Sequence, residues 1–307
     1  MVNSRSMTET LTVPTLTATM APLTAGALGQ FFRPLAGPAG VLFSGTGGYA
    51  LRVGERWVYE PAGIWGWRAA TDDGFVVVDA EGGATHIDAS GARTTPGAAS
   101  GPDGMLSTAA VAWDPARKAL VVFGGAVGKR AVADTWEWRD GVWKRAKVKS
   151  KPAARGHAQM AWVPALDGML VTGGFAKGHH FYDLALYRGG AWEVWEHAPF
   201  CDVELAAALL ACDAASGQVI LGFWTNEPRG LGLWRYAGRG RWELAGHVDF
   251  PSVSTDLAGL WRMQSFLFAL DPATRSLVGV GHDNALRPAI VSVALGAWLD
   301  ALPPLEG

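Results

Sequence analysis

The sequence predicts an all-β protein: a single β-propeller of six blades, each a four-stranded antiparallel sheet, around a central channel. Three observations predict this fold. A pattern of two apolar runs separated by a turn occurs four times along the chain. A tryptophan follows each copy, at steps of about 50 residues, which is the size of one blade. The 307 residues also include 15 Trp and 40 Gly, a pairing that favours many short strands joined by tight turns.

The repeated pattern is a β-hairpin made of two apolar strands. Its four copies read AAVAWDPARKALVVFGG (109–125), AQMAWVPALDGMLVTGG (158–174), ALLACDAASGQVILGFW (208–224) and FLFALDPATRSLVGVGH (266–282). Strands that are so uniformly apolar are typical of sheets covered on both faces. We therefore expect the hairpins to lie inside a stacked assembly.

A candidate third strand and then a tryptophan follow each hairpin. These segments read DTWEWRDGVW (134–143), DLALYRGGAW (183–192), GLWRYAGRGRW (232–242) and IVSVALGAW (290–298). An indole ring is large enough to fill the space between neighbouring sheets. We therefore interpret Trp143, Trp192, Trp242 and Trp298 as packing between blades.

The repeats resemble those of the kelch family. The resemblance is carried by the glycine pairs Gly124–Gly125 and Gly173–Gly174, the aromatic third strand, the later tryptophan and the segment PAARGH (152–157). It is strong over residues 105–250 and weaker over 251–303. It implies a kelch-type propeller, in which the glycines serve turn geometry and do not bind phosphate.

Two degenerate blades precede the clear repeats. VLFSGTGG (41–48) with the following Arg56 and Trp57 indicates one, and FVVVDAEGG (75–83) indicates the other. The outer strand of the second is in question because no tryptophan stands near Arg93. Counting both predicts six blades, with seven as the less favoured alternative if residues 8–35 hide another.

The N-terminal segment is expected to close the ring. We predict that Thr8 to Leu16 supplies an outer strand to the last blade, because closure removes the open seam between first and last blades. The predicted organisation is an N-terminal segment over 1–15, including a tag remnant before Met7 and the closing strand, and one propeller domain over 16–307.

Composition narrows the possible partners. A formal net charge of −2 argues against a nucleic-acid binder or a polybasic membrane binder. Two cysteines, Cys201 and Cys212, are too few for a disulfide-rich scaffold. No apolar stretch reaches the roughly 18 residues of a membrane span, and the N-terminus lacks the apolar core of a signal peptide. We expect a cytoplasmic protein.

One segment is strongly basic. In KRAKVKSK (144–151), a two-residue period places Arg145, Lys147, Lys149 and Lys151 on one face of an outermost strand. Lysines on an exposed edge strand discourage pairing with other chains. A patch for an acidic partner is the alternative.

The kelch resemblance also implies where a ligand binds. In these propellers, the loop after the glycine pair and the approach to the first strand meet on one face near the channel. The candidate ligand-binding residues are His179, Trp224, Asn226, His282 and Asp283 from the first loop type, and Arg155, His157, Glu204 and Arg262 from the second. The early blades contribute Tyr49, with Thr85 or His86 as further candidates. For each residue a solvated loop is the favoured interpretation, and for Arg155 and His157 a structural role, because both match the repeat motif.

Metal chemistry is the less favoured possibility. His157, His179, His180 and His282 could converge, and imidazole suits transition metals. Adjacent histidines on a strand point to opposite faces, so only one of His179 and His180 can be a ligand there. No HExxH or CxxC spacing is present, and we expect no cofactor.

Two classes of function stay open. The favoured one is a binding module that takes a protein segment or a polar small molecule at the channel mouth, with neither nucleic acid nor membrane as partner. The alternative is an enzyme, an isomerase or a metal-assisted lyase or hydrolase, with its active site at the same mouth. Fold alone does not choose between them.

Overall fold

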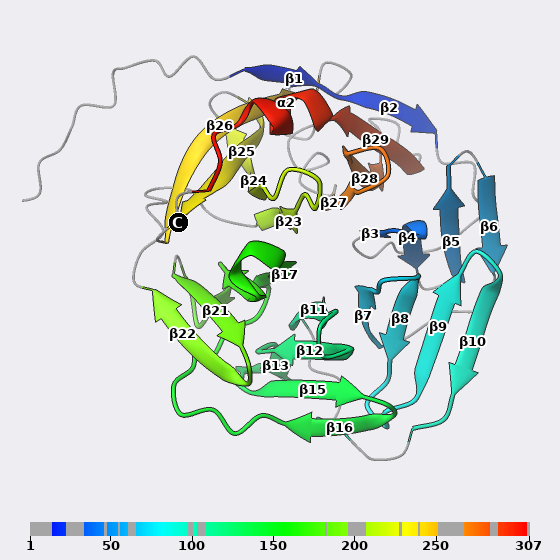
Figure 1. The fold of residues 1–307 in the computed structure, drawn as a ribbon, viewed down its shortest axis with the longest axis vertical. Coiled ribbons are helices and arrows are strands. Elements are labelled where there is room, and N and C mark those ends of the chain that lie inside the picture. Colours follow the sequence, from blue (N-terminus) through cyan, green and yellow to red (C-terminus); the bar gives the residue numbers. More distant parts are fainter. Residues whose placement is uncertain are drawn as a thin grey trace, which may run out of the picture.

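The structure, a computed structural model, describes residues 14–22, 34–45, 48–54, 56–60, 66–97, 101–102, 108–181, 183–195, 207–226, 229–238, 240–250, 267–282 and 288–305. Six small, mainly antiparallel sheets form a ring, and the innermost strand of each lies next to the centre (Figure 1). The protein is a six-bladed β-propeller, which confirms the predicted fold class.

Blades 1 and 2 come from the degenerate part of the sequence. Blade 1 consists of β3 (Leu35–Gly37), β4 (Gly40–Gly45), β5 (Gly48–Val53) and β6 (Arg56–Glu60). Blade 2 consists of β7 (Trp67–Ala70), β8 (Phe75–Val78), β9 (Ala84–Asp88) and β10 (Gly91–Thr95). Every residue of β10 pairs with β9, so the outer strand of blade 2 is present although no tryptophan marks it.

Blades 3 and 4 carry the clearest repeats. Blade 3 consists of β11 (Ala110–Asp114), β12 (Ala119–Phe123), β15 (Thr135–Arg139) and β16 (Val142–Arg145). Blade 4 consists of β17 (Gln159–Val163), the 3₁₀ turn η1 (Pro164–Leu166), β18 (Gly168–Thr172), β21 (Leu184–Arg188) and β22 (Ala191–Trp195). Two short hairpins extend the loops after the glycine pairs: β13 (Ala126–Val127) with β14 (Arg130–Ala131), and β19 (Phe175–Ala176) with β20 (His179–His180).

The basic segment is not the long edge strand that we expected. β16 ends at Arg145, because the chain must leave the outer edge of blade 3 and cross to the inner strand of blade 4. Arg145 and Lys151 instead approach the same carboxylate of Asp134, at 2.6 and 3.8 Å. The prediction of four cations on one strand face is therefore wrong.

Blades 5 and 6 are completed by the N-terminal segment. Blade 5 consists of β23 (Ala207–Cys212), β24 (Val219–Asn226), β25 (Arg229–Gly238) and β26 (Arg241–Asp249). Blade 6 consists of β27 (Leu267–Asp271), β28 (Ser276–His282) and β29 (Pro288–Ala294), followed by α2 (Gly296–Ala301). β1 (Thr15–Thr17) adds a parallel fifth strand to blade 5, and β2 (Thr19–Pro22) is the antiparallel outer strand of blade 6 (Figure 1).

The ring is closed by the N-terminal segment, as expected, but with a different strand. The strand on β29 is Thr19–Pro22, and the Thr19 hydroxyl donates a hydrogen bond of 3.1 Å to the Ser292 carbonyl. Leu16, which we placed in that strand, lies in β1 opposite Val248 of blade 5. Residues 8–13 lie outside the described ranges.

The recurring tryptophans pack between blades. The indole N–H of Trp143 donates to the Asp79 carbonyl of blade 2, and that of Trp192 donates to the Thr135 hydroxyl of blade 3, both at 2.9 Å. Trp298 donates to the Ala245 carbonyl of blade 5 at 3.1 Å. For these three residues the predicted role is confirmed. Trp298, however, lies on α2 and not on an outer strand.

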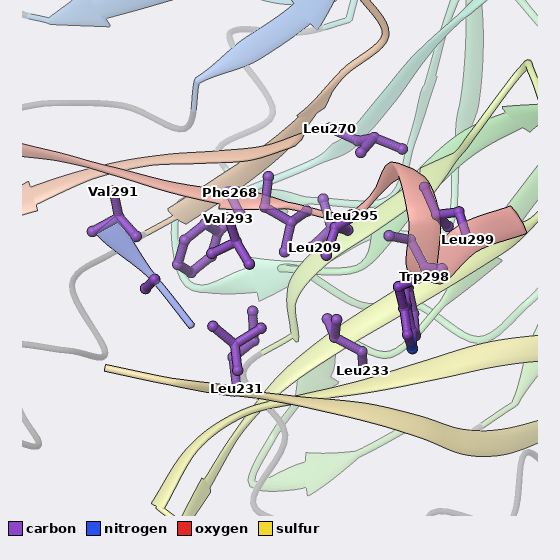
Figure 2. Packing of buried hydrophobic residues seen from close by; sticks show 14 of the residues in the cluster. Leu209, Leu231, Leu233, Phe268, Leu270, Val291, Val293, Leu295, Trp298 and Leu299 are labelled. Atoms are coloured by element: carbon purple, nitrogen blue, oxygen red, sulfur yellow. The ribbon is translucent and has the colours of Figure 1, made fainter. Parts of the chain in front are cut away.

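The core consists of apolar layers between neighbouring blades. Figure 2 shows the layer between blades 5 and 6, where Leu209, Leu233, Phe268 and Val293 meet. Trp298 on α2 covers the same layer and is 8% exposed. Helix α2 therefore seals the place where the last blade meets the one before it.

The strand order gives the propeller two different faces. In every blade the turn between strands one and two lies on one side, which we call the hairpin face, and in blades 1 to 5 the turn between strands three and four lies there too. The loops between strands two and three, and the entries into the inner strands, lie on the other side, the loop face. Within the described ranges, no helix has the length and apolarity that a membrane crossing requires.

Candidate functional site

Arg155, a predicted ligand-binding residue, is buried and its contacts lie inside the protein. The side chain is 1% exposed, and its guanidinium forms a two-pronged ion pair with Asp183, with one N···O distance of 2.7 Å. It also donates to the carbonyls of Gly173 (3.2 Å) and Ala153 (3.0 Å), and it lies 4.0 Å from the ring centre of Phe181. These contacts describe the structural role that the repeat motif suggested as the alternative.

The backbone of Arg155 also explains one glycine pair. Its carbonyl accepts a hydrogen bond of 2.8 Å from the Gly125 N–H of the preceding blade. A Cβ on Gly124 would stand 2.6 Å from the same oxygen, and Gly124 has a φ of +69°. The glycine pair and the arginine motif thus hold neighbouring blades together.

His157 and His179 each contact an aromatic ring on the loop face of blade 4. The His157 ring stacks on Phe175, with ring centres 4.9 Å apart and planes 18° apart. His180 lies on the other strand of the β19–β20 hairpin, 6.0 Å from Phe175, which is 43% exposed. His179 contacts the edge of Phe181 at 5.0 Å. The described contacts therefore place His157 with Phe175 and His180, and His179 with Phe181.

The remaining candidates can be placed only in part. Trp224 and Asn226 lie at the end of β24 and His282 at the end of β28, at the loop face, where the structure describes their backbone alone. Glu204, Arg262 and Asp283 lie outside the described residues. Tyr49, expected at the rim, is instead 1% exposed in the layer between blades 1 and 2. Burial raises its pKa, and the charges of Glu60 and Asp88 raise it further.

The channel is the cavity to which all six blades contribute. It has a volume of about 280 Å³, and its described lining comes from β3, β7, β11, β17, β23 and β27 with adjoining residues. The walls are mainly apolar and include the aromatic side chains Trp113, Trp162 and Phe268. Small-molecule sites combine apolar and aromatic side chains with polar groups that orient the ligand, and the channel wall has both kinds of surface.

One charged residue, Arg68, belongs to the described channel lining. It is the second residue of β7, at the loop-face end of the channel, because every inner strand enters from that face. Its guanidinium donates to the hydroxyl of Ser44 on blade 1. Burial lowers the pKa of Arg68 to about 10, so the group still carries its charge at neutral pH.

Arg68 was not among the residues predicted from the sequence. It lies in a degenerate repeat, where no motif draws attention to it. The pattern that could have found it is the alignment of inner strands, since Arg68 takes the place of Val111 in blade 3 and Met160 in blade 4. A charge at an otherwise apolar repeat position is a specific indication of function.

Cys212 lies in the channel wall near the hairpin face. Burial raises the pKa of its thiol to about 12, and the neighbouring Asp213 charge adds to the effect. The thiol therefore stays protonated at neutral pH, which is unfavourable for a nucleophilic thiolate. In the same wall, the buried indole N–H of Trp113 has no hydrogen-bond acceptor among the described residues.

The described residues do not form a set of metal ligands. Among the residues the structure describes, no three His, Cys, Asp or Glu side chains stand together in a way that could hold a metal ion. His179 and His180 are consecutive residues of β20, as the argument about alternate faces assumed. The side chain of His282 lies outside the described part of the structure, so its role as a metal ligand stays a prediction.

The geometry of the channel and the loop face is thus the main guide to function. No protein-family model matches this chain, and no curated protein matches it in sequence.

Proposed function

We propose that this propeller binds a small organic anion, with the apolar body of the ligand in the central channel and its charged group at Arg68. The observation that carries the proposal is the composition of the channel wall: apolar and aromatic side chains from six inner strands, with a single cation in the described lining. The proposal refines the predicted binding of a polar small molecule at the channel mouth.

The position of Arg68 supports an oriented ligand. Its guanidinium lies toward the loop face, whereas Trp113 and Trp162 line the channel closer to the hairpin face. A ligand that enters from the loop face would leave its carboxylate at the arginine and place its apolar part between the rings. Guanidinium groups bind planar carboxylates through paired hydrogen bonds, which are stronger when the site excludes water.

The size of the channel limits the ligand. A cavity of about 280 Å³ is near the lower end for small-molecule sites, so we expect an aromatic or short-chain acid. A relationship to the kelch family is part of the same proposal. It is supported by the left-handed φ angles of both glycine pairs and by the hydrogen bond from the Gly125 N–H to the Arg155 carbonyl. Binding of a protein segment at the rim stays a prediction, and so does enzymatic activity at the channel mouth.

The test compares two probes that differ in charge. Binding of 4-fluorobenzoate and 4-fluorobenzamide is measured by ¹⁹F NMR for the native protein and for Arg68→Met. We expect benzoate to bind the native protein and to lose at least tenfold in affinity in Arg68→Met, because the variant keeps the side-chain volume and removes the charge. The benzamide affinity should change little.

Arg93→Met is the matched control, since Arg93 lies on the outer strand β10 of the same blade and is largely exposed. It should leave both affinities unchanged. Equal benzoate affinity in the native protein and Arg68→Met, or no saturable benzoate binding at all, would contradict the proposal.

A further inference from the structure

A separate cavity lies on the opposite face of the molecule from the loop face. It measures about 330 Å³ and belongs to blade 3, where it is lined by Arg117, Ala119, Glu137, Arg139, Val142 and Lys144. Arg117 comes from the turn between β11 and β12, and Arg139 and Val142 flank the turn between β15 and β16. Both turns lie on the hairpin face, so this pocket is distinct from the mouth of the channel near Arg68.

The pocket opens beside blade 4. Glu137 is paired with Val121 on one side and with Lys144 on the other, so these three side chains share one face of the sheet. Val121 packs against Met169 and Tyr187 of blade 4, which shows that this face points toward that blade. The pocket is therefore the outer, hairpin-face end of the space between two blades.

Arg117 is held at this pocket by contacts with three residues. Its Nε donates to Asp114 at 2.6 Å, and its Nη1 donates to Glu137 at 2.7 Å. The hydroxyl of Tyr187 donates to the same Glu137 oxygen, also at 2.7 Å, and the guanidinium lies 5.7 Å from the Tyr187 ring centre. Two carboxylates and a buried ring thus hold the guanidinium beside the pocket before any ligand arrives.

One nitrogen of the Arg117 guanidinium has no hydrogen-bond acceptor among the described residues. This nitrogen, Nη2, is buried. A buried donor without an acceptor costs free energy in the folded protein, and a ligand oxygen would recover it. Because Nε and Nη1 are already used, Nη2 is the atom of this guanidinium that a small movement can turn to a ligand.

The charges around the pocket favour an anion. The lining carries three cations, Arg117, Arg139 and Lys144, against one carboxylate, Glu137. That carboxylate already accepts hydrogen bonds from Arg117 and Tyr187. Among the described residues, Arg139 forms an ion pair with the exposed Asp140, at 3.8 Å, and an exposed pair of this kind is weak. With Asp114 and Asp140 included, three cations face three carboxylates, so the excess of positive charge belongs to the pocket lining itself.

We propose that this pocket binds the phosphate group of a small phosphate ester, held by Nη2 of Arg117 and by the side chains of Arg139 and Lys144. Three cationic groups from two turns and an edge strand can surround a tetrahedral dianion. The flat, paired geometry of a carboxylate would engage one of them at a time. The cavity also leaves room for the organic part of the ester beside Val142 and Ala119.

Glycerol 3-phosphate is the probe for the test, with inorganic phosphate as the smallest anion of the class and glycerol and acetate as controls. Affinities are measured by isothermal titration calorimetry at constant ionic strength. We expect saturable binding of the phosphates and at least a tenfold loss in Arg139→Gln/Lys144→Gln. Both substituted side chains are exposed, so the fold should be retained.

Lys129→Gln/Arg130→Gln is the matched control, because it removes two exposed cations from the loop face of the same blade. It should bind as the native protein does, and so should Arg68→Met. The guanidinium NMR signals of Arg117 should also shift when phosphate binds. No saturable phosphate binding, equal losses in both double variants, or unchanged Arg117 signals would each overturn the proposal.

Discussion

Gly124 shows how much depends on a single residue in this fold. Its left-handed backbone and its closeness to the Arg155 carbonyl leave no place for a side chain, although the sequence around it only suggests a turn. Gly128, four residues further on, has a similar φ of +59°, but a Cβ at this residue would have no atom within 4 Å. Gly128 therefore shares the backbone conformation of Gly124 without its crowded surroundings.

This contrast predicts different costs for the same substitution. Gly128→Ala should lower the free energy of unfolding by about 1 kcal/mol, the cost of a left-handed backbone at a residue with a Cβ. Gly124→Ala should cost roughly 1–3 kcal/mol more, because the new methyl group must push the Arg155 carbonyl away. Urea denaturation of both variants measures the difference, and equal costs would show that the contact between blades yields without strain.

Arg68 illustrates at the same scale why the candidate site was only partly predictable. The resemblance to kelch repeats directed attention to the loop face and to Arg155, whose side chain proved to be buried in internal contacts. Motif residues recur because each blade needs them, whereas a ligand is contacted by residues that differ from blade to blade. Arg68, which we propose as a ligand-binding residue, differs from the corresponding residues of other blades and carries no motif.

At the scale of elements, the N-terminal strands have the largest effect for their length. β1 and β2 together cover the outer edges of blades 5 and 6, which would otherwise present unpaired backbone groups to solvent and to other chains. Their position could not be read from the sequence. Threonine alternates with other residues through most of 8–19, so several registers fit equally well, and only pairing with β26 and β29 selects one.

Removal of these strands should destabilise the whole ring. A variant that begins at residue 23 should have a lower melting temperature than one that begins at residue 14 and keeps both strands. It should also self-associate, because the edges of β26 and β29 become free to pair. Differential scanning calorimetry and light scattering test this, and identical melting temperatures would mean that closure contributes no stability.

Other elements were predictable because their patterns are local. Each apolar hairpin contains its own turn, and the tryptophan that follows lies next to the preceding blade whichever element carries it. Trp298 fills this position from a helix, since the outer strand of blade 6 is supplied by the N-terminal segment. The sequence thus predicted that the tryptophan side chain would lie next to the preceding blade. It did not predict whether a strand or a helix would carry that tryptophan.

At the scale of the whole molecule, a three-residue ionic group links the last two blades with the C-terminal helix. Arg275 of blade 6 binds Asp213 of blade 5 at 2.7 Å and Asp300 of α2 at 2.8 Å. Burial of Asp213 opposes ionisation, but hydrogen bonds from Arg275 and Ser216 outweigh it and lower its pKa. The hydrogen bond from Arg275 also lowers the pKa of Asp300.

The lowered pKa values give a direction for pH dependence. Both carboxylates lose their protons more readily in the folded protein, so their contribution to stability is complete above about pH 4, where unfolded Asp ionises. It is lost as the pH falls through the folded-state values. We expect urea midpoints to fall below pH 4 in the native protein and to fall less steeply in Arg275→Gln. Parallel profiles would show that this ionic group does not set the acid limit.

The pairing of β2 with β29 also has a consequence for how the protein is made. Thr19 and Ser292, which share a hydrogen bond, are 273 positions apart in the chain. Thr19 is therefore synthesised long before Ser292. Blades 1 to 4 contain all their own strands and can assemble in order of translation. β1 and β2 are synthesised before their partners β26 and β29, so the ring can close only after those two strands have been made.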